Sequence, residues 1–410
     1  MQSLVRYTRH DVSSTLAATD TTHSSSINKF VNNIVSDKKN LANAEYCLLK
    51  TGEKNYFTPR HVLILSKTTR LQYELSLHNI TYDQMNHAKF TSKLRSLNIN
   101  IPALEAKHLA QTNYVNTIAN AFIKKGISVR IVTRDEYEKE NLEGYDLIVT
   151  AGGDGTFLTA ASKIINDIPI IGFNSDYHGS EGHLCVARKL NISPDYIISK
   201  FLEGNYNWMY RQRITVTIEN IYNDKDYCSF NGKKVFHALN EVFIGEVNAA
   251  RVSYYEVSIN NEKAIKQKSS GLSICSGTGS TAWHYSINRL NGNKLESIIH
   301  VLESMGINFN EQRKNDNFIK EACDKYNSQL AFDPSYNQMA YSIREPIFND
   351  TFLSMPQTGF TTKMKILSRC SDAQIVLDGN KTIPFNYGTE ITLQMFPENA
   401  LRTINMNFSD

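Results

Sequence analysis

Residues 145–156 read Tyr-Asp-Leu-Ile-Val-Thr-Ala-Gly-Gly-Asp-Gly-Thr, and this stretch decides the fold class. Its first six residues, with Leu147, Ile148 and Val149 at their centre, are typical of a buried strand, and the glycine-rich segment 151–155 follows at once. After the glycines, Leu158, Ala161, Ile164 and Ile165 fall on one helical face. A strand that ends in glycines and opens a helix is where an α/β sheet binds phosphate. The stretch therefore predicts an α/β domain with an anion site at the start of this helix.

The neighbouring segments predict a parallel sheet. A continuous apolar run, His61–Ser66, indicates a strand buried on both faces. A helical pattern at 109–123 is followed by strand patterns at 128–132 and 168–171. Strands that alternate with helices are typical of a parallel sheet. We therefore predict an N-terminal α/β domain over residues 58–208.

From about Arg213 onward the pattern changes to short strands. Ile214, Val216 and Ile218 alternate with polar residues, as a half-buried strand requires. Similar runs recur at 253–259, 272–275, 363–367, 374–377 and 390–395. These runs predict a β-rich C-terminal domain over residues 209–405.

A helical insertion is predicted inside this β-rich region. Residues 295–305 and 317–326 carry apolar side chains at helical spacing. Since strand patterns stand on both sides of them, the insertion is expected at about 290–335.

Residues 1–40 are predicted to form a flexible tail or an organelle presequence. They are rich in Ser and Thr and show almost no helical or strand periodicity. Arg6 and Arg9 fit a presequence. Asp11 and Asp20 do not, because presequences are poor in acidic residues. Both interpretations stay open.

Composition excludes several classes of protein. The chain has 410 residues, 41% of them hydrophobic, which is enough for two domains and excludes wholesale disorder. Its 44 Lys and Arg nearly balance 41 Asp and Glu, so we expect no nucleic-acid partner. No apolar run approaches the roughly 18 residues of a membrane span, so no membrane partner is expected. The six cysteines are too far apart for a zinc or dithiol site and are interpreted as reduced packing residues.

Asp154 is anomalous among the glycines. A carboxylate is repelled from a site built only for phosphate, so Asp154 is expected to remove a proton or to hold Mg²⁺. The alternative is a Gly-Gly-Asp-Gly surface turn in which Asp154 merely caps the helix. The order of strand, glycines and helix favours the functional interpretation.

A second glycine cluster spans residues 276–282 and contains G-x-G-x-x-A. A dinucleotide-binding turn of this pattern opens an apolar-faced helix in a βαβ unit, whereas residues 284–293 are polar and irregular. Thr278, Ser280 and Thr281 add hydroxyl groups that could wrap phosphate or ribose without such a unit. A glycine-rich hairpin is the alternative.

The Asn240–Glu241 pair interrupts an otherwise apolar strand pattern. Such a pair can accept hydrogen bonds from ribose hydroxyls or from an amide. Alone, it is more simply explained as a strand edge or an exposed turn.

Taken in order, three segments make the chain resemble the NAD kinase family, most nearly the mitochondrial branch of animal NAD kinases. They are Gly152–Thr156, Asn240–Glu241 and Thr278–Thr281. Further stretches that carry the resemblance are Lys67–Arg70, Ser180–Cys185, Trp208–Arg213, Leu239–Glu246, Gln267–Gly271, Ser342–Pro346, Val376–Gly379 and Pro384–Asn386. The resemblance covers residues from about 60 to about 405.

The resemblance implies a function and a set of site residues. ATP would phosphorylate the 2′-hydroxyl of the adenosine ribose of NAD, with Mg²⁺ accompanying ATP, with no metal site of the protein's own, and with Asp154 as general base. The implied NAD-binding residues are Asp154, Gly155, His183, Asn240, Glu241, Lys268, Ser270, Thr281, Ala282, Trp283 and Ser286. The residues predicted to bind ATP or its phosphates are Lys67, Arg70, Gly152, Gly153, Thr156, Gly277, Thr278, Gly279 and Ser280.

Two positions depart from the bacterial pattern of the family. Ser270 stands where bacterial members have an acidic residue, and Trp283 stands where they have Tyr. Trp keeps a stacking surface, but Ser cannot make the charge-assisted bond that a carboxylate makes to a ribose hydroxyl.

Other functions and properties remain as predictions. Lipid kinases of the diacylglycerol type and phosphofructokinases share the Gly-Gly-Asp-Gly-Thr element, and an NAD-binding sensor without turnover belongs to a different class. The resemblance further implies a homodimer or higher homo-oligomer in the mitochondrion, with the cytoplasm as the alternative location.

Overall fold

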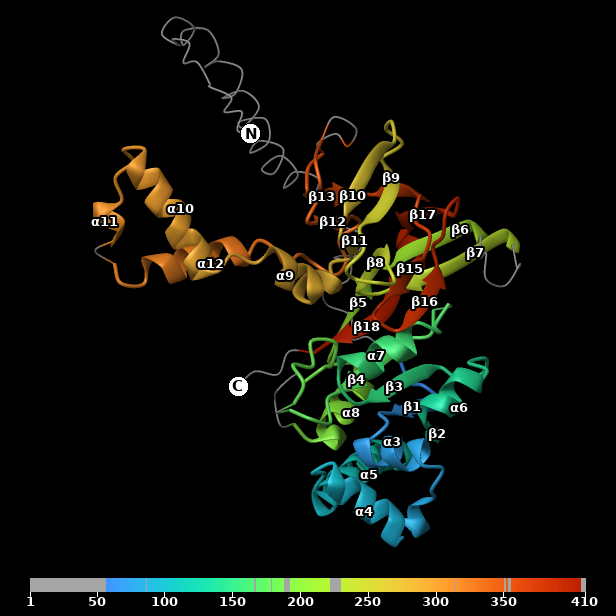
Figure 1. The fold of residues 1–410 in the computed structure, drawn as a ribbon. Coiled ribbons are helices and arrows are strands. Elements are labelled where there is room, and N and C mark those ends of the chain that lie inside the picture. The colour runs from blue at the N-terminus through green and yellow to red at the C-terminus, as the bar shows by residue number, and fades with distance from the viewer. Residues whose placement is uncertain are drawn as a thin grey trace, which may run out of the picture. The chain divides into compact units, whose positions relative to one another are not determined.

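The computed structural model describes residues 57–85, 87–165, 167–177, 179–187, 192–221, 230–313, 315–349, 352 and 355–406. The tail or presequence predicted at 1–40 lies outside the described residues. Figure 1 shows the arrangement of the elements, whose labels are used below.

The first sheet has six strands, five of which run parallel, and four of these five are the strands predicted from the sequence. β1 pairs with β2 on one side and with β3 on the other, and β3 pairs with β4, all in parallel. Along the sheet the strands are β2 (Ser128–Val132), β1 (His61–Ser66), β3 (Leu147–Ala151), β4 (Ile170–Phe173), β18 (Leu401–Asn405) and β5 (Asn207–Arg211). In β1, Val62–Leu65 is fully buried, which confirms the strand predicted to be covered on both faces.

Helices cover both faces of this sheet. Val62 and Ile64 pack with α5 and α8, whereas Leu63 and Leu65 pack with α6 and α7. The helices of this region are α3 (Arg70–Leu77), α4 (Ala88–Ser96), α5 (Ile101–Ile123), α6 (Arg134–Lys139), α7 (Asp154–Ala161) and α8 (Pro194–Leu202), with a 3₁₀ turn η2 (Tyr82–Gln84). Because successive residues of a strand face opposite sides, a run of four apolar residues serves both layers.

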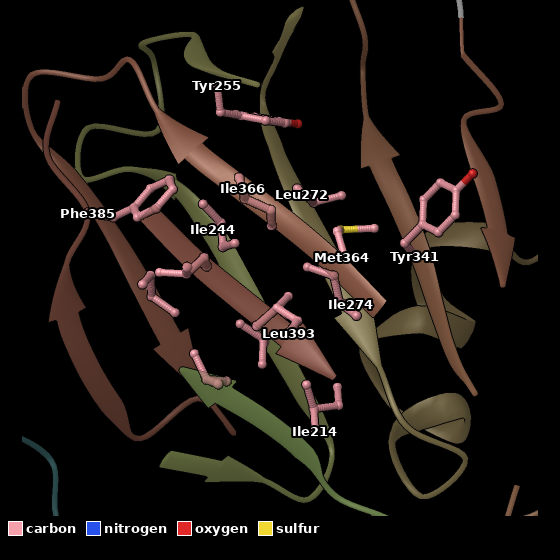
Figure 2. Close-up of a cluster of buried hydrophobic side chains, with 14 of the residues drawn as sticks. Ile214, Ile244, Tyr255, Leu272, Ile274, Tyr341, Met364, Ile366, Phe385 and Leu393 are labelled. Atoms are coloured by element: carbon pink, nitrogen blue, oxygen red, sulfur yellow. The ribbon is translucent and has the colours of Figure 1, made fainter. Parts of the chain in front are cut away.

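The β-rich region contains two antiparallel sheets of six strands each. One sheet has the order β10 (Ile265–Ser269), β9 (Ser253–Ile259), β14 (Lys363–Ser368), β17 (Glu390–Met395), β6 (Ile214–Ile221) and β7 (Phe230–Ala238). The other has β13 (Thr358–Thr361), β12 (Met339–Arg344), β11 (Gly271–Cys275), β8 (Glu241–Glu246), β15 (Ala373–Leu377) and β16 (Lys381–Pro384). Their inner faces share one core, in which Ile244, Ile274, Met364 and Leu393 are fully buried (Figure 2).

Helices stand between β11 and β12, where the insertion is predicted. They are α9 (Trp283–Asn288), α10 (Gly292–Ser304), α11 (Asn310–Arg313) and α12 (Phe318–Asn327), and a 3₁₀ turn η3 (Gly279–Thr281) precedes α9. Residues 284–288, expected to be irregular, belong to the helix α9. The helix is anchored by His284, which is buried and hydrogen-bonded to Asn288 and Ser342.

The chain returns to its first sheet at its end. β18 pairs in parallel with β4 and antiparallel with β5, and the 3₁₀ turn η4 (Pro397–Asn399) precedes it. Residues 401–405 were expected in the β-rich domain, but their strand pairing assigns them to the α/β sheet. A single strand pattern does not reveal its partner, so the sequence could not have shown this.

Candidate active site

Asp154 is the first residue of α7, and its carboxylate is not used by its own helix. Gly153 occupies the N-cap position, where no side chain caps the helix. The Asp154 carboxylate instead accepts hydrogen bonds from the backbone amides of His183 (3.1 Å) and Leu184 (2.8 Å). The capping alternative is therefore wrong, and the carboxylate is oriented by a loop 29 and 30 residues farther along the chain.

The glycines before and after Asp154 have different roles. A Cβ on Gly152 would lie 2.4 Å from Thr156 Oγ1 and 2.9 Å from the Cβ of Lys67. A Cβ on Gly153 would lie 2.5 Å from the hydroxyl of Ser180. Gly155 is exposed, and a Cβ there would meet nothing within 4 Å. The first two glycines allow close packing around Asp154, and the third leaves an open approach to the helix start.

Lys67 lies at this glycine loop. Its backbone amide donates to the carbonyl of Ala151 (3.0 Å), and its ammonium lies 3.9 Å from Asp176 Oδ2. Burial lowers the pKa of Lys67, while the charge of Asp176 opposes that shift. A cavity of about 330 Å³ beside it is lined by Ser66, Lys67, Thr68, Gln72, Tyr73, Ser76, Thr133, Arg134 and Asp135. A cation and several polar groups therefore face one cavity at the carboxyl edge of β1.

Arg70 is held differently from Lys67. Its guanidinium pairs with Glu74 on its own helix at 2.5 Å and lies 5.2 Å from the ring centre of Tyr73. The predicted pair of cations thus separates into one at the glycine loop and one on the surface of α3.

Asn240 lies in the turn between β7 and β8, and Glu241 is the first residue of β8. The Asp378 carboxylate accepts from the amides of Leu239 (2.8 Å), Asn240 (2.7 Å) and Glu241 (3.1 Å). This set of bonds holds the backbone of the pair. Burial and the nearby charge of Asp378 raise the pKa of Glu241 to about 7.

Both side chains of the pair carry buried oxygens with no protein partner. Asn240 Oδ1 and Glu241 Oε2 are buried and make no hydrogen bond in the described structure. Buried polar atoms in a folded protein are nearly always bonded, so each such atom requires an explanation. A ligand with hydroxyl or amide donors would satisfy both.

The segment 276–282 packs directly against this pair. The Ser276 amide donates to the Asn240 carbonyl (2.9 Å). A Cβ on Gly279 would lie 2.1 Å from that same carbonyl oxygen, and one on Gly277 would lie 2.0 Å from the carbonyl oxygen of Asp333. These two glycines are therefore required by close backbone packing.

The surroundings of residues 276–282 concern two predictions, phosphate binding by this segment and its exclusion from a βαβ unit. Residues 276–280 are buried, and the amides of Gly279 and Ser280 bond within the segment. Their assignment to phosphate stays a prediction. β11 pairs antiparallel with both β8 and β12, so the G-x-G-x-x-A match stands outside any βαβ unit, as expected.

A chain of contacts connects Asp154 with the segment 276–282. The buried thiol of Cys185 donates to the Gly152 carbonyl at 3.7 Å. Burial raises its pKa to about 12, with the charge of Asp154 adding to the shift and that of Arg211 opposing it. Arg211 donates to the hydroxyl of Thr278 (3.4 Å). The two glycine-rich segments thus lie within reach of one site.

The remaining predicted residues come from η3 and α9, from β10 and from the segment between β4 and α8. The Trp283 ring lies 4.8 Å from that of Phe243 and is 39% exposed, so it can stack on a ligand. Thr281 and Ser286 are exposed, Ala282 is half-buried, and the Lys268 ammonium lies 6.0 Å from the ring centre of Phe352. The exposed His183 contributes its backbone amide to Asp154, and its implied role in binding NAD stays a prediction.

Sequence reasoning missed three residues of this site. Asp378 holds the Asn240–Glu241 backbone, and the buried Arg213 donates to the carbonyl of Ile164 (2.5 Å) just after α7 while its charge acts on Asp378. Glu345 accepts a hydrogen bond from Ser270. The Asp-Gly dipeptide at 378–379 signals a tight turn, but no local pattern indicates what its carboxylate binds.

Within the described residues, no group of three or more His, Cys, Asp or Glu side chains could hold a metal ion. The four described cysteines are free and buried, which agrees with their interpretation as packing residues. None of the described helices combines the length and apolar character that spanning a bilayer requires.

The sequence is similar to that of known NAD kinases. Residues 57–206 match the family described as the ATP-NAD kinase N-terminal domain. The human protein named NAD kinase 2, mitochondrial, is 34% identical over 378 residues, covering 85% of this chain and 84% of its own length. The Xenopus tropicalis protein of the same name is 31% identical over 401 residues, covering 86% and 92%. A crystal structure of an NAD kinase from Archaeoglobus fulgidus in complex with ATP superimposes with a TM-score of 0.47 at 15% identity, covering 84% of this chain and 92% of that one.

Proposed function

This chain belongs to the NAD kinase family, and we propose that its Asp154 is the base that allows ATP to phosphorylate the 2′-hydroxyl of the adenosine ribose of NAD. The observation that carries this proposal is the Asp154 carboxylate. Two amides from another loop orient it at the start of α7, and it caps nothing. A carboxylate held in this way is an acceptor positioned for a proton.

The reaction requires one bond to form and one to break. The 2′-oxygen bonds to the γ-phosphorus of ATP while the bond from that phosphorus to the β,γ-bridging oxygen breaks, and ADP leaves. The hydroxyl proton passes to Asp154. Positioning and charge stabilisation contribute most to such a transfer, because its transition state involves little covalent chemistry by the protein.

Mg²⁺ is proposed to arrive with ATP. The described residues hold no cluster of three metal-ligating side chains, and Mg²⁺ commonly binds through substrate phosphates with one or two carboxylates. Asp154 and Asp176 are the carboxylates at the glycine loop that fit this arrangement. When bound, the ion neutralises phosphate charge.

NAD is proposed to lie against Asn240 and Glu241. Their unpartnered oxygens accept from ribose hydroxyls, and Trp283 offers a stacking surface beside them. Gly155, Thr281, Ala282 and Ser286, with Lys268, Ser270 and His183, are proposed as further contacts.

ATP is proposed to lie on the side of Lys67. The Lys67 ammonium suits phosphate oxygens, and the start of α7 adds partial positive charge beside it. The amides of Gly152 and Thr156 already donate to the carbonyls of Phe173 and Gly153, so Gly152, Gly153 and Thr156 are proposed as phosphate neighbours through their position at the helix start. Arg70 and Gly277–Ser280 remain proposed phosphate contacts.

Asp154→Asn tests this proposal. The amide keeps the shape of the side chain and loses its basicity, so turnover should fall about 10²–10⁴-fold while NAD affinity changes little. Purified protein is incubated with NAD and MgATP, and NADP is detected with an NADP-specific dehydrogenase. Asp195→Asn, at an acid in the first turn of α8, is the matched control and should retain wild-type activity. An equal loss of NAD affinity in Asp154→Asn would make Asp154 a binding residue, and NAD binding by the wild type without NADP formation would make the protein a sensor.

Location and assembly are proposed from the relatives. The human and frog proteins are named mitochondrial, and we propose the mitochondrion for this chain. Residues 1–40 fused to a fluorescent reporter should direct it there, and a diffuse signal would favour the cytoplasm. We also propose a homodimer or higher homo-oligomer, which light scattering on the purified chain would reveal.

A further inference from the structure

Glu345 has a backbone conformation that its residue type does not explain. It follows β12 and has a φ of 47°, in the left-handed region. Six non-glycine residues of the described chain have positive φ, and the other five are Asn or Asp. Asn and Asp favour this region because their short side chains bond locally, an advantage that Glu lacks. This unfavourable backbone conformation fixes the position of the Glu345 carboxylate.

That place is beside Ser270. The Ser270 hydroxyl donates to Glu345 Oε2, and the Ser270 amide donates to the carbonyl of Arg344 (3.0 Å). With its one proton given to Glu345, the Ser270 hydroxyl can only accept, and an ionised carboxylate has no donor. Ser270 is half-buried and Glu345 is exposed, so the pair presents acceptors alone to the surface. A surface of this kind suits a ligand that offers two neighbouring hydroxyl donors.

The pair lies at the far end of β11 from Glu241. β11 places Cys275 opposite Glu241 and Gly271 opposite Arg344. β11 spans about 13 Å from Cys275 to Gly271, and Ser270 precedes it. The two groups of acceptors are therefore separated by a distance comparable with the length of an extended dinucleotide.

Aromatic rings stand between these two ends, and the guanidinium of Arg344, whose backbone lies at the Ser270 end, reaches toward them. Phe243 and Arg344 alternate with core residues of their strands and so face outward with Glu241. The guanidinium of Arg344 lies 5.7 Å from the ring centre of Trp283, which packs on Phe243. A stacking ring and a cation between two sets of acceptors match a molecule with two riboses joined through a pyrophosphate.

We propose that Ser270 and Glu345 bind the vicinal hydroxyls of the second ribose of NAD, the one that is not phosphorylated, with Glu345 as the charged acceptor. This assignment rests on the proposed function. It adds a binding residue and does not alter the transfer step at Asp154.

Two substitutions at Glu345 test the assignment. Glu345→Gly removes the carboxylate and suits the left-handed backbone, whereas Glu345→Gln keeps the length and removes the charge. In each, the KM for NAD should rise about tenfold, with kcat and the KM for MgATP within twofold of wild type, because a contact made equally in ground and transition states is lost. Glu262→Gln, at an exposed glutamate of the β9–β10 turn, is the control and should leave all three constants unchanged.

An NAD analogue separates this role from a structural one. An analogue that lacks both hydroxyls of the nicotinamide ribose should have a KM about tenfold above that of NAD with the wild type, and Glu345→Gly should raise it no further. If both Glu345 variants keep the wild-type KM for NAD, or if Glu345→Gly raises the KM for the analogue as much as that for NAD, the assignment is overturned. If the wild-type protein forms no NADP from NAD and MgATP, the proposed function itself is wrong.

Discussion

The two glycine-rich segments, 151–156 and 276–282, have similar compositions and opposite surroundings. In the first, Gly155 is exposed with open space at its Cβ position, and the helix start is accessible. In the second, residues 276–280 are buried, and Gly277 and Gly279 lie against backbone carbonyls. The first segment therefore combines closely packed glycines, Gly152 and Gly153, with open space at Gly155, whereas the glycines of the second segment serve close backbone packing alone.

Gly279→Ala should lower stability most, and it tests most directly whether the two segments differ. Its Cβ would lie 2.1 Å from the Asn240 carbonyl oxygen, a backbone atom that cannot move alone. We expect the free energy of unfolding in urea to fall by about 3 kcal/mol. Gly155→Ala is the matched control. With no atom within 4 Å, it should raise stability by up to about 1 kcal/mol. Equal destabilisation by the two substitutions would show that both segments serve packing.

Asp378→Asn tests whether the Asp378 carboxylate holds the backbone at 239–241, against which the segment 276–282 packs. An Asn cannot accept from all three amides at 239–241, because one carboxylate oxygen becomes an NH₂ group. We expect a loss of about 2 kcal/mol in unfolding free energy and a KM for NAD raised at least tenfold. Asp83→Asn, on the exposed turn η2, is the control. An unchanged KM for NAD would mean that the Asn240–Glu241 backbone does not need Asp378.

The raised pKa of Glu241 predicts that stability depends on pH. Its pKa is about 7 in the folded protein against an ordinary 4.5, so the folded state holds the proton longer as pH rises. Between pH 4.5 and 7 the unfolded state therefore binds fewer protons, and stability falls with rising pH. The stability of the wild type relative to Glu241→Gln should fall by about 2–3 kcal/mol from pH 4.5 to pH 8.

The same titration should appear in substrate binding. Ionised Glu241 accepts from a ribose hydroxyl better than the protonated form, so the KM for NAD should fall as pH rises through about 7. Glu241→Gln should abolish that dependence. A pH profile identical in wild type and variant would remove Glu241 from the NAD site.

Several features of the site follow from the sequence because they are local. The strand, the glycines and the helix at 145–161 are adjacent in the chain, and their order predicts both the sheet and the position of Asp154. Asn240 and Glu241 could be singled out because polar residues interrupt an apolar run. The sequence misled where polar composition hid the helix α9, whose His284 is buried.

Other features depend on contacts between distant residues. Asp378 bonds to amides 137–139 residues away, and Glu345 accepts from a serine 75 residues away. Gly277 packs against the backbone of Asp333, and β18 pairs with β4, and both partners are distant in the sequence.

The amino-acid sequence by itself determined the two kinds of domain, the helical insertion and the placement of an acid at a helix start, since side-chain periodicity and turn chemistry act over a few neighbours. Only the tertiary structure decided which glycine segment is open, which carboxylates orient the site and where the last strand pairs. Those outcomes depend on backbone atoms brought within hydrogen-bond or van der Waals distance by the whole fold, and such distances leave no local trace in the order of residues.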